Sequence, residues 1–283
     1  MKRWPSPWTR RLLVALLAAQ VSVQAWSADA GMEAFKEVLA RDDLAGLKQL
    51  VTAHRARGEA LPRDPLGGAS VLHKAIHLGA DEPLLAWLLD AGADVHARTS
   101  DDAETPLHFA ARFGCDYCVR RLLAHGARLD VRDAEGQLPI HVAGYGVVDA
   151  LLDDGADPLA TDPRGNVALH RVFHPRLLVA GVNVRNQGGL TPLHFAALSD
   201  SVRGIDWLLA QGADPELETT AVYRYRAPIM SRAFGPGDPI PAGSRPLDLA
   251  RWKADSTRWN LQTHKQSVAK LEAVTRKRFL GLW

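Results

Sequence analysis

The sequence lacks the short motifs on which the common hydrolases and nucleotide-binding enzymes depend. It contains no Gly-x-Ser-x-Gly turn, no phosphate-binding loop of the form GxxxxGK followed by Ser or Thr, and no HExxH helix for a zinc peptidase. The acidic residues gather instead in short turns, as at Asp90 and Asp153, where an aspartate caps a helix or fixes a loop. We therefore expect neither an enzyme nor a cofactor.

Cysteine is almost absent, since Cys115 and Cys118 are the only two. They form a CxxC pair after Gly114, where a helix is expected to start, and a helix N-terminus favours thiol–disulfide exchange. In an oxidising compartment the pair could equally be closed as a structural disulfide. Val119 rather than His follows, which excludes covalent haem attachment, and no βαβ unit surrounds the pair as in a thioredoxin-like enzyme. We favour a structural role for Cys115 and Cys118, either as a closed disulfide or as buried core residues. Thiol–disulfide exchange and metal binding remain as alternatives.

Long hydrophobic runs are missing except near the beginning. There, the largely apolar segment Leu12 to Val23 follows four Lys or Arg residues and precedes a stretch of small residues at 25–30. A run of this length is too short to span a bilayer comfortably and has the layout of a secretory signal. We expect a signal peptide over residues 1–28, with an uncleaved anchor as the alternative. The amino-acid composition, which is rich in Ala, Arg and Leu, suggests a bacterial source. We therefore expect residues 31–283 to be exported to the periplasm.

The charge is unevenly distributed along the chain. The whole sequence of 283 residues carries a net charge of +2, but residues 220–283 hold 12 Lys or Arg against 4 Asp or Glu, a net of +8. The four basic residues of the first 28 leave 18 Lys or Arg against 28 Asp or Glu between these segments, a net of −10. An acidic body argues against nucleic acid as the main partner and favours a basic protein.

One stretch, residues 186–214, shows the unit from which the chain is built. A turn at Gly188 and Gly189 leads into Thr191-Pro192-Leu193-His194, with proline in the first turn of a helix. A second, more apolar helix follows and ends near Gly212, a residue favoured at helix C-termini. Such a unit cannot bury its own apolar face and therefore needs neighbours.

The TPLHFAA segment of this unit resembles the signature of the ankyrin repeat. Looser copies surround His73, His108, His141 and His170, and a degenerate last copy lies at residues 244–250. The resemblance implies an all-α solenoid of stacked helix-turn-helix units, joined by hairpin-like turns and closed by helical caps. Successive motif histidines lie 35, 33, 29 and 24 residues apart, against a family period of about 33. The third and fourth units are therefore shortened, and we expect clipped helices there.

The resemblance also implies a role for the motif histidines. In the family, this side chain bonds to the backbone of adjacent turns and holds successive repeats in register, so a structural role is expected for His73, His108, His141, His170 and His194. Two pairs, His73 with His77 and His170 with His174, have the i, i+4 spacing that would place both rings on one helix face. Neither pair has the adjacent Glu of a zinc hydrolase, so no metal site is expected.

Residues 31–283 are expected to form one domain, because a repeat stack shares a continuous core. It comprises an N-terminal cap at about 32–60, repeats at about 64–218, an insertion at 219–243, and a degenerate repeat with its C-terminal cap at 244–283. The insertion is rich in Tyr, Arg, Gly and Pro, so it is either a binding element or a loop that covers the last repeat. The basic, aromatic end at 276–283 either contacts an anionic membrane or, as is favoured, packs back as part of the cap.

These features predict a monomeric, exported module that binds a protein of unknown identity. By resemblance, contacts come from the concave face of turn tips and first helices, joined by the insertion. The candidate partner-binding residues are Ser100, Asp101, Asp102, Arg112, Phe113, Glu135, Gln137, Arg164, Asn166, Gln187, Leu190, Tyr223, Arg224, Tyr225, Arg226 and Phe234. A scaffold or stress-related partner of an exported enzyme is one role. The alternatives are an immunity protein that neutralises a secreted toxin and a thiol-redox protein that uses the CxxC pair.

Overall fold

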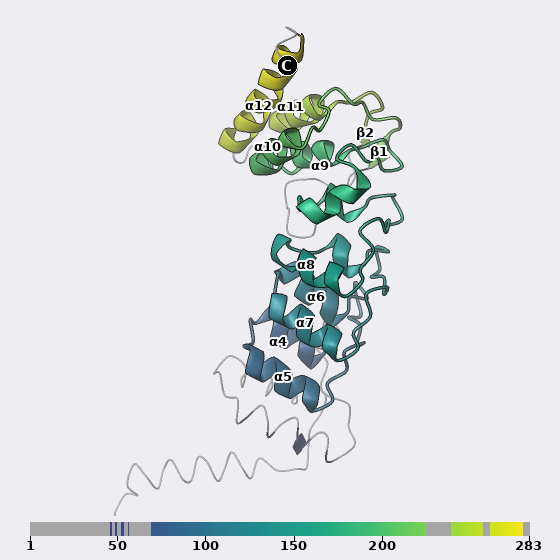
Figure 1. Cartoon of the computed structure of the whole chain (residues 1–283), viewed down its shortest axis with the longest axis vertical. Coiled ribbons are helices and arrows are strands. Elements are labelled where there is room, and N and C mark those ends of the chain that lie inside the picture. Colours follow the sequence, from purple (N-terminus) through teal and green to yellow (C-terminus); the bar gives the residue numbers. More distant parts are fainter. Residues whose placement is uncertain are drawn as a thin grey trace, which may run out of the picture.

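The computed structural model describes residues 69–224, 239–256 and 261–279, and the isolated positions 46, 49, 52, 53 and 56. The expected signal peptide, nearly all of the N-terminal cap and the middle of the insertion lie outside the described residues. Helices stacked in chain order form one column, with the two last helices at one end (Figure 1). The prediction of an all-helical stack of paired helices is confirmed.

Five helix pairs follow one another and a sixth closes the described stack. The α-helices of the first two pairs are α4 (Val71–His77), α5 (Glu82–Asp90), α6 (Pro106–Phe113) and α7 (Asp116–Ala124). The third and fourth pairs consist of 3₁₀ helices η1 (Pro139–His141) and η2 (Tyr145–Val147), α8 (Val148–Asp153), and 3₁₀ helices η3 (Ala168–His170) and η4 (Pro175–Ala180). The last pairs are α9 (Pro192–Leu198) with α10 (Val202–Ala210) and α11 (Pro246–Ser256) with α12 (Leu261–Phe279). A two-stranded antiparallel ribbon, β1 (Tyr223–Arg224) and β2 (Pro239–Ile240), lies between α10 and α11.

The second unit shows how the sequence sets the helix ends. The Thr105 hydroxyl accepts a hydrogen bond from the His108 N–H, and Pro106 occupies the first turn, where its missing N–H is no loss. Gly114 ends α6 in the left-handed conformation, with a φ of 67°. The chain thereby turns back, so that α7 packs against α6.

The shortened units have clipped helices, as the spacing of the histidines predicts. Each first helix of the third and fourth units is a single 3₁₀ turn of three residues. The fourth unit has no α-helix at all, because its second helix is the six-residue η4, which starts with Pro175. With only 24 residues between His170 and His194, the chain cannot complete two full helices and still cross to the next turn.

The motif histidines join each unit to the next. Each Nε2 lies 2.9 to 3.1 Å from a backbone carbonyl oxygen of the following unit. In four cases that carbonyl belongs to the residue just before the next first-helix motif: Glu104, Gln137, Leu190 and Ser244. His141 bonds instead to Ala160, earlier in the turn, so the contact between the third and fourth units is displaced.

The geometry fixes the protonation of these rings. Each Nδ1 lies 3.0 to 3.2 Å from the backbone N–H of the residue three positions earlier, so it must accept. Each Nε2 faces a carbonyl oxygen and must therefore carry the hydrogen. A second proton would have to sit on Nδ1, against a backbone donor. Burial is the main cause that lowers the pKa of His108 and His141, and it lowers the pKa of His170 and His194 to about 4.

The core of the described stack is divided at the fourth unit. One cluster of buried side chains runs from Val71 to Leu177, and a second joins α9 and α10 to α11 and α12. Phe173 packs against the second cluster from the fourth unit, and a Cβ atom at Gly204 would lie 2.3 Å from its ring. Only glycine allows α10 to approach Phe173 this closely, and this contact adds to the His170–Leu190 bond that joins the clipped unit to its neighbour.

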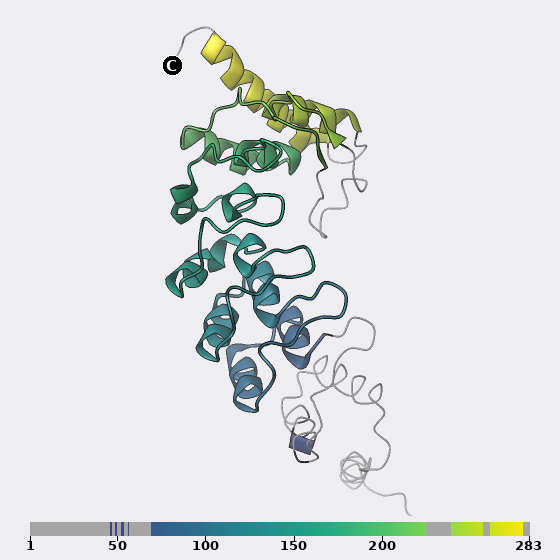
Figure 2. The same cartoon turned by 90° about the vertical axis from the view of Figure 1, so that its right-hand side faces the viewer.

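The turns project together from one side of the stack (Figure 2). In three of them an Asp or Asn side chain accepts two backbone N–H bonds, as Asp133 does from Glu135 and Gln137. The turn then passes through a left-handed glycine, which is Gly136, Gly165 or Gly189 in those three turns. In the turn before α6 the same position is Ala103, with a φ of 50°. An alanine there is strained, because its Cβ crowds the following carbonyl.

The neutral histidines make stability depend on pH. Because the pKa of His170 and His194 falls from 6.5 to about 4 on folding, the unfolded chain binds more protons between these values. Above pH 6.5 both rings are neutral in the folded and the unfolded chain, and the free energy of unfolding has its full value. As the pH falls from 6.5 towards 4, protonation of the unfolded chain lowers that free energy by about 3 kcal/mol for each ring. Urea unfolding followed by circular dichroism should give a lower free energy of unfolding at pH 5.0 than at pH 7.5. His194→Gln should show a smaller difference, and equal stability at both pH values would contradict the assignment.

The strained alanine gives a second prediction. Ala103→Gly should raise the free energy of unfolding by about 0.5 to 1 kcal/mol, because relief of the left-handed strain exceeds the entropy that glycine loses. The matched control is Gly136→Ala, whose added Cβ would lie 2.3 Å from Pro163 Cγ and which should therefore destabilise the fold. Both are measured by urea unfolding at pH 7.5, and a destabilised Ala103→Gly protein would show that the strain is not real.

Candidate protein-docking surface

The candidate site is a row of side chains at or just after the ends of the first helices. Arg112 and Phe113 lie four and five residues after the motif histidine His108. The same spacing from His73 leads to His77 and Leu78, and the spacing of four from His141 leads to Tyr145. We call these five residues the docking row.

The docking row is open and largely apolar. Leu78, Phe113 and Tyr145 are 55%, 39% and 61% exposed, which is unusual for large hydrophobic side chains in this stack. The rings of His77 and Phe113 meet edge to face at 5.4 Å, so the first and second units form one continuous surface. Contiguous apolar patches that remain exposed on a folded protein often mark sites of interaction with another protein.

The row closes at the fourth and fifth units. His174, four residues after His170, is buried, and its ring lies 4.7 Å from that of Tyr145. Leu198, four residues after His194, is completely buried in a cluster with Tyr223 and Ile240. Tyr223 belongs to β1 and Ile240 to β2, so the base of the insertion covers the first helix of the fifth unit. The open part of the row therefore ends at Tyr145.

Arg112 lies at the edge of the docking row, and its guanidinium already forms an ion pair within the protein. Its guanidinium pairs with the carboxylate of Glu104, which is buried in the turn before α6. Glu104 also offers its backbone carbonyl to His73, so one residue joins the arginine to the bonds between units. Arg112 is consequently held in place rather than free to reach towards a partner.

The predicted turn-tip residues divide into accessible and buried ones. Ser100, Asp101, Asp102 and Gln187 are exposed, and Glu135 and Arg164 are half-buried. For three others the prediction of partner contact was wrong, because the side chains of Gln137, Asn166 and Leu190 are buried.

Contacts between units explain these three buried side chains. The Asn166 amide donates to Asp162 and accepts from Asn186, both at 2.8 Å, in a polar chain along the turns. Leu190 packs in the cluster under β1 and β2. Gln137, whose carbonyl lies 3.1 Å from His108 Nε2, turns its side chain towards Glu135 along the turn.

The insertion is described only at its base. Tyr223, predicted to contact a partner, is instead buried, because its ring packs over the Gly188 turn and its hydroxyl lies 3.4 Å from the Asn166 amide. The side chain of Arg224 and the whole of Tyr225, Arg226 and Phe234 lie outside the described residues. At its base, the insertion therefore acts as a loop that covers the last repeats, which was one of the two roles that its sequence suggested.

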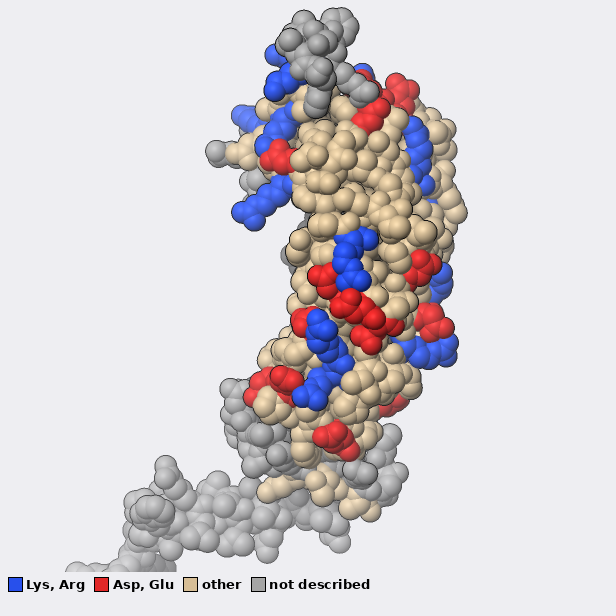
Figure 3. Space-filling model, viewed as in Figure 1, with Lys and Arg blue, Asp and Glu red and all other residues tan. Residues whose placement is uncertain are grey.

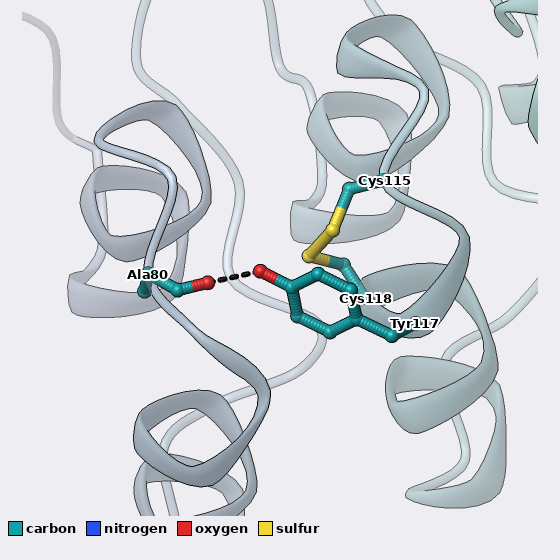
Figure 4. Close-up of a disulfide and its surroundings, with 4 residues drawn as sticks. All are labelled: Ala80, Cys115, Tyr117 and Cys118. Carbon is teal, nitrogen blue, oxygen red and sulfur yellow. Dashed lines mark hydrogen bonds between the residues drawn. A yellow bond between two sulfur atoms is a disulfide. The ribbon is translucent and has the colours of Figure 1, made fainter.

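The cysteines lie apart from the motif histidines. Cys115 and Cys118 are closed in a disulfide at the start of α7 (Figure 4). His170 and His174 do not share a helix face, because η3 ends at His170 and His174 caps η4. Within the described ranges, no three His, Cys, Asp or Glu side chains are grouped as a metal site would require.

Three residues of the docking row, His77, Leu78 and Tyr145, were not among the predicted partner-binding residues. A signal was available, because they have the same distance from their motif histidine as Arg112 and Phe113. What the sequence could not supply is the exposure of each position, which depends on the segments packed against it.

Charge is mixed along the described stack. Acidic and basic side chains alternate over the face in Figure 3, and basic ones gather at the end that carries α11 and α12. Arg121 of α7 pairs with Glu82 of α5 at 2.8 Å, and Arg176 of η4 pairs with Asp153 of α8 at 2.7 Å. These ion pairs join the second helices of neighbouring units, so many of the charged side chains contact other parts of the stack. No helix in the described part of the chain has the length and apolar character needed to cross a membrane.

Comparison with known families agrees with this architecture. Residues 63–162 match a family model described as ankyrin repeats in three copies, and residues 188–220 match the model of a single ankyrin repeat. The chain is 31% identical over 148 residues to palmitoyltransferase AKR1 of Lachancea kluyveri and 34% identical over 141 residues to human rabankyrin-5. These alignments cover 46% and 45% of this chain but only 20% and 10% of the relatives.

Human B-cell lymphoma 3 protein is 30% identical over 163 residues, or 50% of this chain and 36% of that protein. The crystal structure of the ankyrin repeat domain of Bcl-3 superposes with a TM-score of 0.53 and 25% identity, over 66% of this chain and 89% of that one. The chain thus spans about a third or less of these curated relatives. Stacked helix pairs, histidine bonds from unit to unit and matches to two repeat models together make the chain an ankyrin-repeat protein.

Proposed function

We propose that this chain is a non-enzymatic module that binds a partner protein through the docking row and the exposed turn tips beside it. Ankyrin repeats are protein–protein interaction modules, and their domains are usually non-catalytic. The observation that carries the proposal is the exposure of Leu78, Phe113 and Tyr145, each at or just after the end of the first helix of successive units. Aromatic side chains held on a rigid surface dock with little loss of entropy and are common at the centres of interfaces.

The polar surroundings favour an extended contact rather than a single pocket. Ser100, Asp101 and Asp102 form an exposed acidic tip on the turn before α6, and Gln187 is exposed on the turn three units further along the column. The body of the chain carries the net negative charge calculated above. A partner with an apolar ridge and basic flanks would match both features, because complementary charge steers encounter while the apolar centre supplies affinity.

The setting we propose is the periplasm of a bacterium, on the strength of the leader-like segment at 1–28. A disulfide is also the form in which cysteines persist in an oxidising compartment. Within that setting, the partner is an exported enzyme for which the stack acts as scaffold or stress-related companion. An immunity role against a basic secreted toxin would use the same surface and the same charge, and the identity of the captured partner distinguishes the two.

The third prediction tests the surface directly. The double variant Phe113→Ala/Tyr145→Ala should lose partner binding by at least about tenfold in Kd, since truncating two central aromatic anchors costs roughly 2 kcal/mol or more. The matched control is Leu159→Ala/Val179→Ala, which removes two equally exposed apolar side chains that do not belong to the docking row. Partners are captured from a periplasmic extract, identified by mass spectrometry and measured against each purified variant by calorimetry.

A third variant separates the insertion from the docking row. Deleting residues 225–238 and joining β1 to β2 by a short turn preserves Tyr223 and Ile240, which the fifth unit needs. Binding lost only with this deletion would move the site to the insertion. Equal binding by the docking-row variant and its control would show that the row is not the interface.

A further inference from the structure

The Cys115–Cys118 disulfide occupies the place where three other units have a side-chain helix cap. The residue before the second helix accepts a backbone N–H bond in three units: Asp81 from Leu84, His174 from Arg176 and Ser201 from Gly204. Cys115 precedes α7 in the same way but makes no such side-chain bond. The second unit lacks this cap, as does the third, in which Gly144 and Val147 precede η2 and α8.

Other units of the stack fold without a disulfide. No other described unit contains one, yet each still forms a pair of α- or 3₁₀ helices. Cys115 and Cys118 are three residues apart, and the stabilisation from a disulfide grows with the length of the loop it closes. The core beneath is already filled by the fully buried Val119 and Leu122. A structural need therefore does not account for the pair.

The two cysteines differ in exposure. Cys115 is partly exposed, whereas Cys118 is 1% exposed. Tyr117, between them in sequence, donates its hydroxyl to the Ala80 carbonyl of the first unit and so fixes the start of α7 (Figure 4). Cys115 is the N-cap of the nine-residue helix α7 and Cys118 lies in its first turn, where the unpaired N–H groups and the helix dipole stabilise thiolates. Of the two, Cys115 is therefore the cysteine that an outside thiolate can reach more easily, and the buried Cys118 would supply the leaving sulfur.

We propose that Cys115 and Cys118 form a thiol–disulfide exchange site that acts on a dithiol protein. A thiolate of that protein attacks Cys115 Sγ, the Sγ–Sγ bond breaks, and its electron pair leaves on Cys118 Sγ, which takes up a proton. A second thiolate of the same protein then attacks its own sulfur in the mixed disulfide and releases Cys115. The partner dithiol loses two electrons and two protons and becomes a disulfide, while the Cys115–Cys118 pair gains them and becomes a dithiol.

The position of the site gives it access to a bound protein. Only Gly114 separates Cys115 from Phe113, the central residue of the docking row. A protein held on that row would therefore present its surface beside the disulfide. The exchange chemistry itself does not require docking, so it can be tested with small probes whether or not the row binds a partner.

The decisive experiment mixes the full-length protein in its oxidised form with one equivalent of a reduced synthetic peptide that contains two cysteines. After acid quenching, mass spectrometry should find the peptide disulfide and the reduced protein in equal amounts, while the circular dichroism spectrum stays unchanged. The Cys115→Ser/Cys118→Ser protein should oxidise no peptide. Reduction that occurs only when the protein unfolds, or a peptide that stays reduced, would overturn the proposal.

Single variants assign the two sulfurs. Folded Cys118→Ser protein should form a mixed disulfide with oxidised glutathione at Cys115 at least tenfold faster than folded Cys115→Ser protein does at Cys118. Equal rates would contradict the assignment of Cys115 as the attacked sulfur. Because glutathione and the peptide do not need the docking row, a failure here leaves the proposed binding function standing, and the reverse also holds.

Discussion

The bond from each motif histidine to the next unit is the interaction on which the stack depends. A single neutral ring accepts from its own helix start and donates across the boundary, so it fixes both the beginning of a helix and the position of the following turn. Such a buried bond contributes about 1 kcal/mol when made and costs more when one partner is left unpaired. Every boundary from the first unit to the last repeat has one, including those around the clipped units.

The shortened units change the surface without breaking this pattern. Because η1 and η3 are single turns, the side chains that follow them are placed differently from those after α6. Tyr145 is left exposed and its ring lies tilted against that of His174, which ends the open row in the middle of the column. Beyond it, β1 and β2 cover α9 and close the same face. A regular array would offer one long surface, whereas this chain offers a short one with the disulfide at its side.

Much of the fold followed from short segments of sequence, and less of the site did. The TPLH copies predicted the helix pairs, and their unequal spacing predicted the clipped helices. Phe113 was found because its position relative to His108 is a local property. Gln137, Asn166 and Leu190 were misplaced, because a turn residue faces solvent or the stack according to its neighbours in the next unit. Asn166 faces inward since Asn186, 20 residues on, supplies its hydrogen-bond donor.

The sequence by itself determined where each helix begins, how many units there are and which histidines join them, since capping residues, glycines and repeat spacing act over a few residues. The tertiary structure alone decided which of the equivalent positions stay open. Tyr145 and Leu198 both lie four residues after a motif histidine, yet one is 61% exposed and the other is fully buried. The difference comes from Tyr223 and Ile240, which the insertion brings over α9 from 25 and 42 residues further along the chain. Burial is a property of what packs against a residue, and no local pattern contains it.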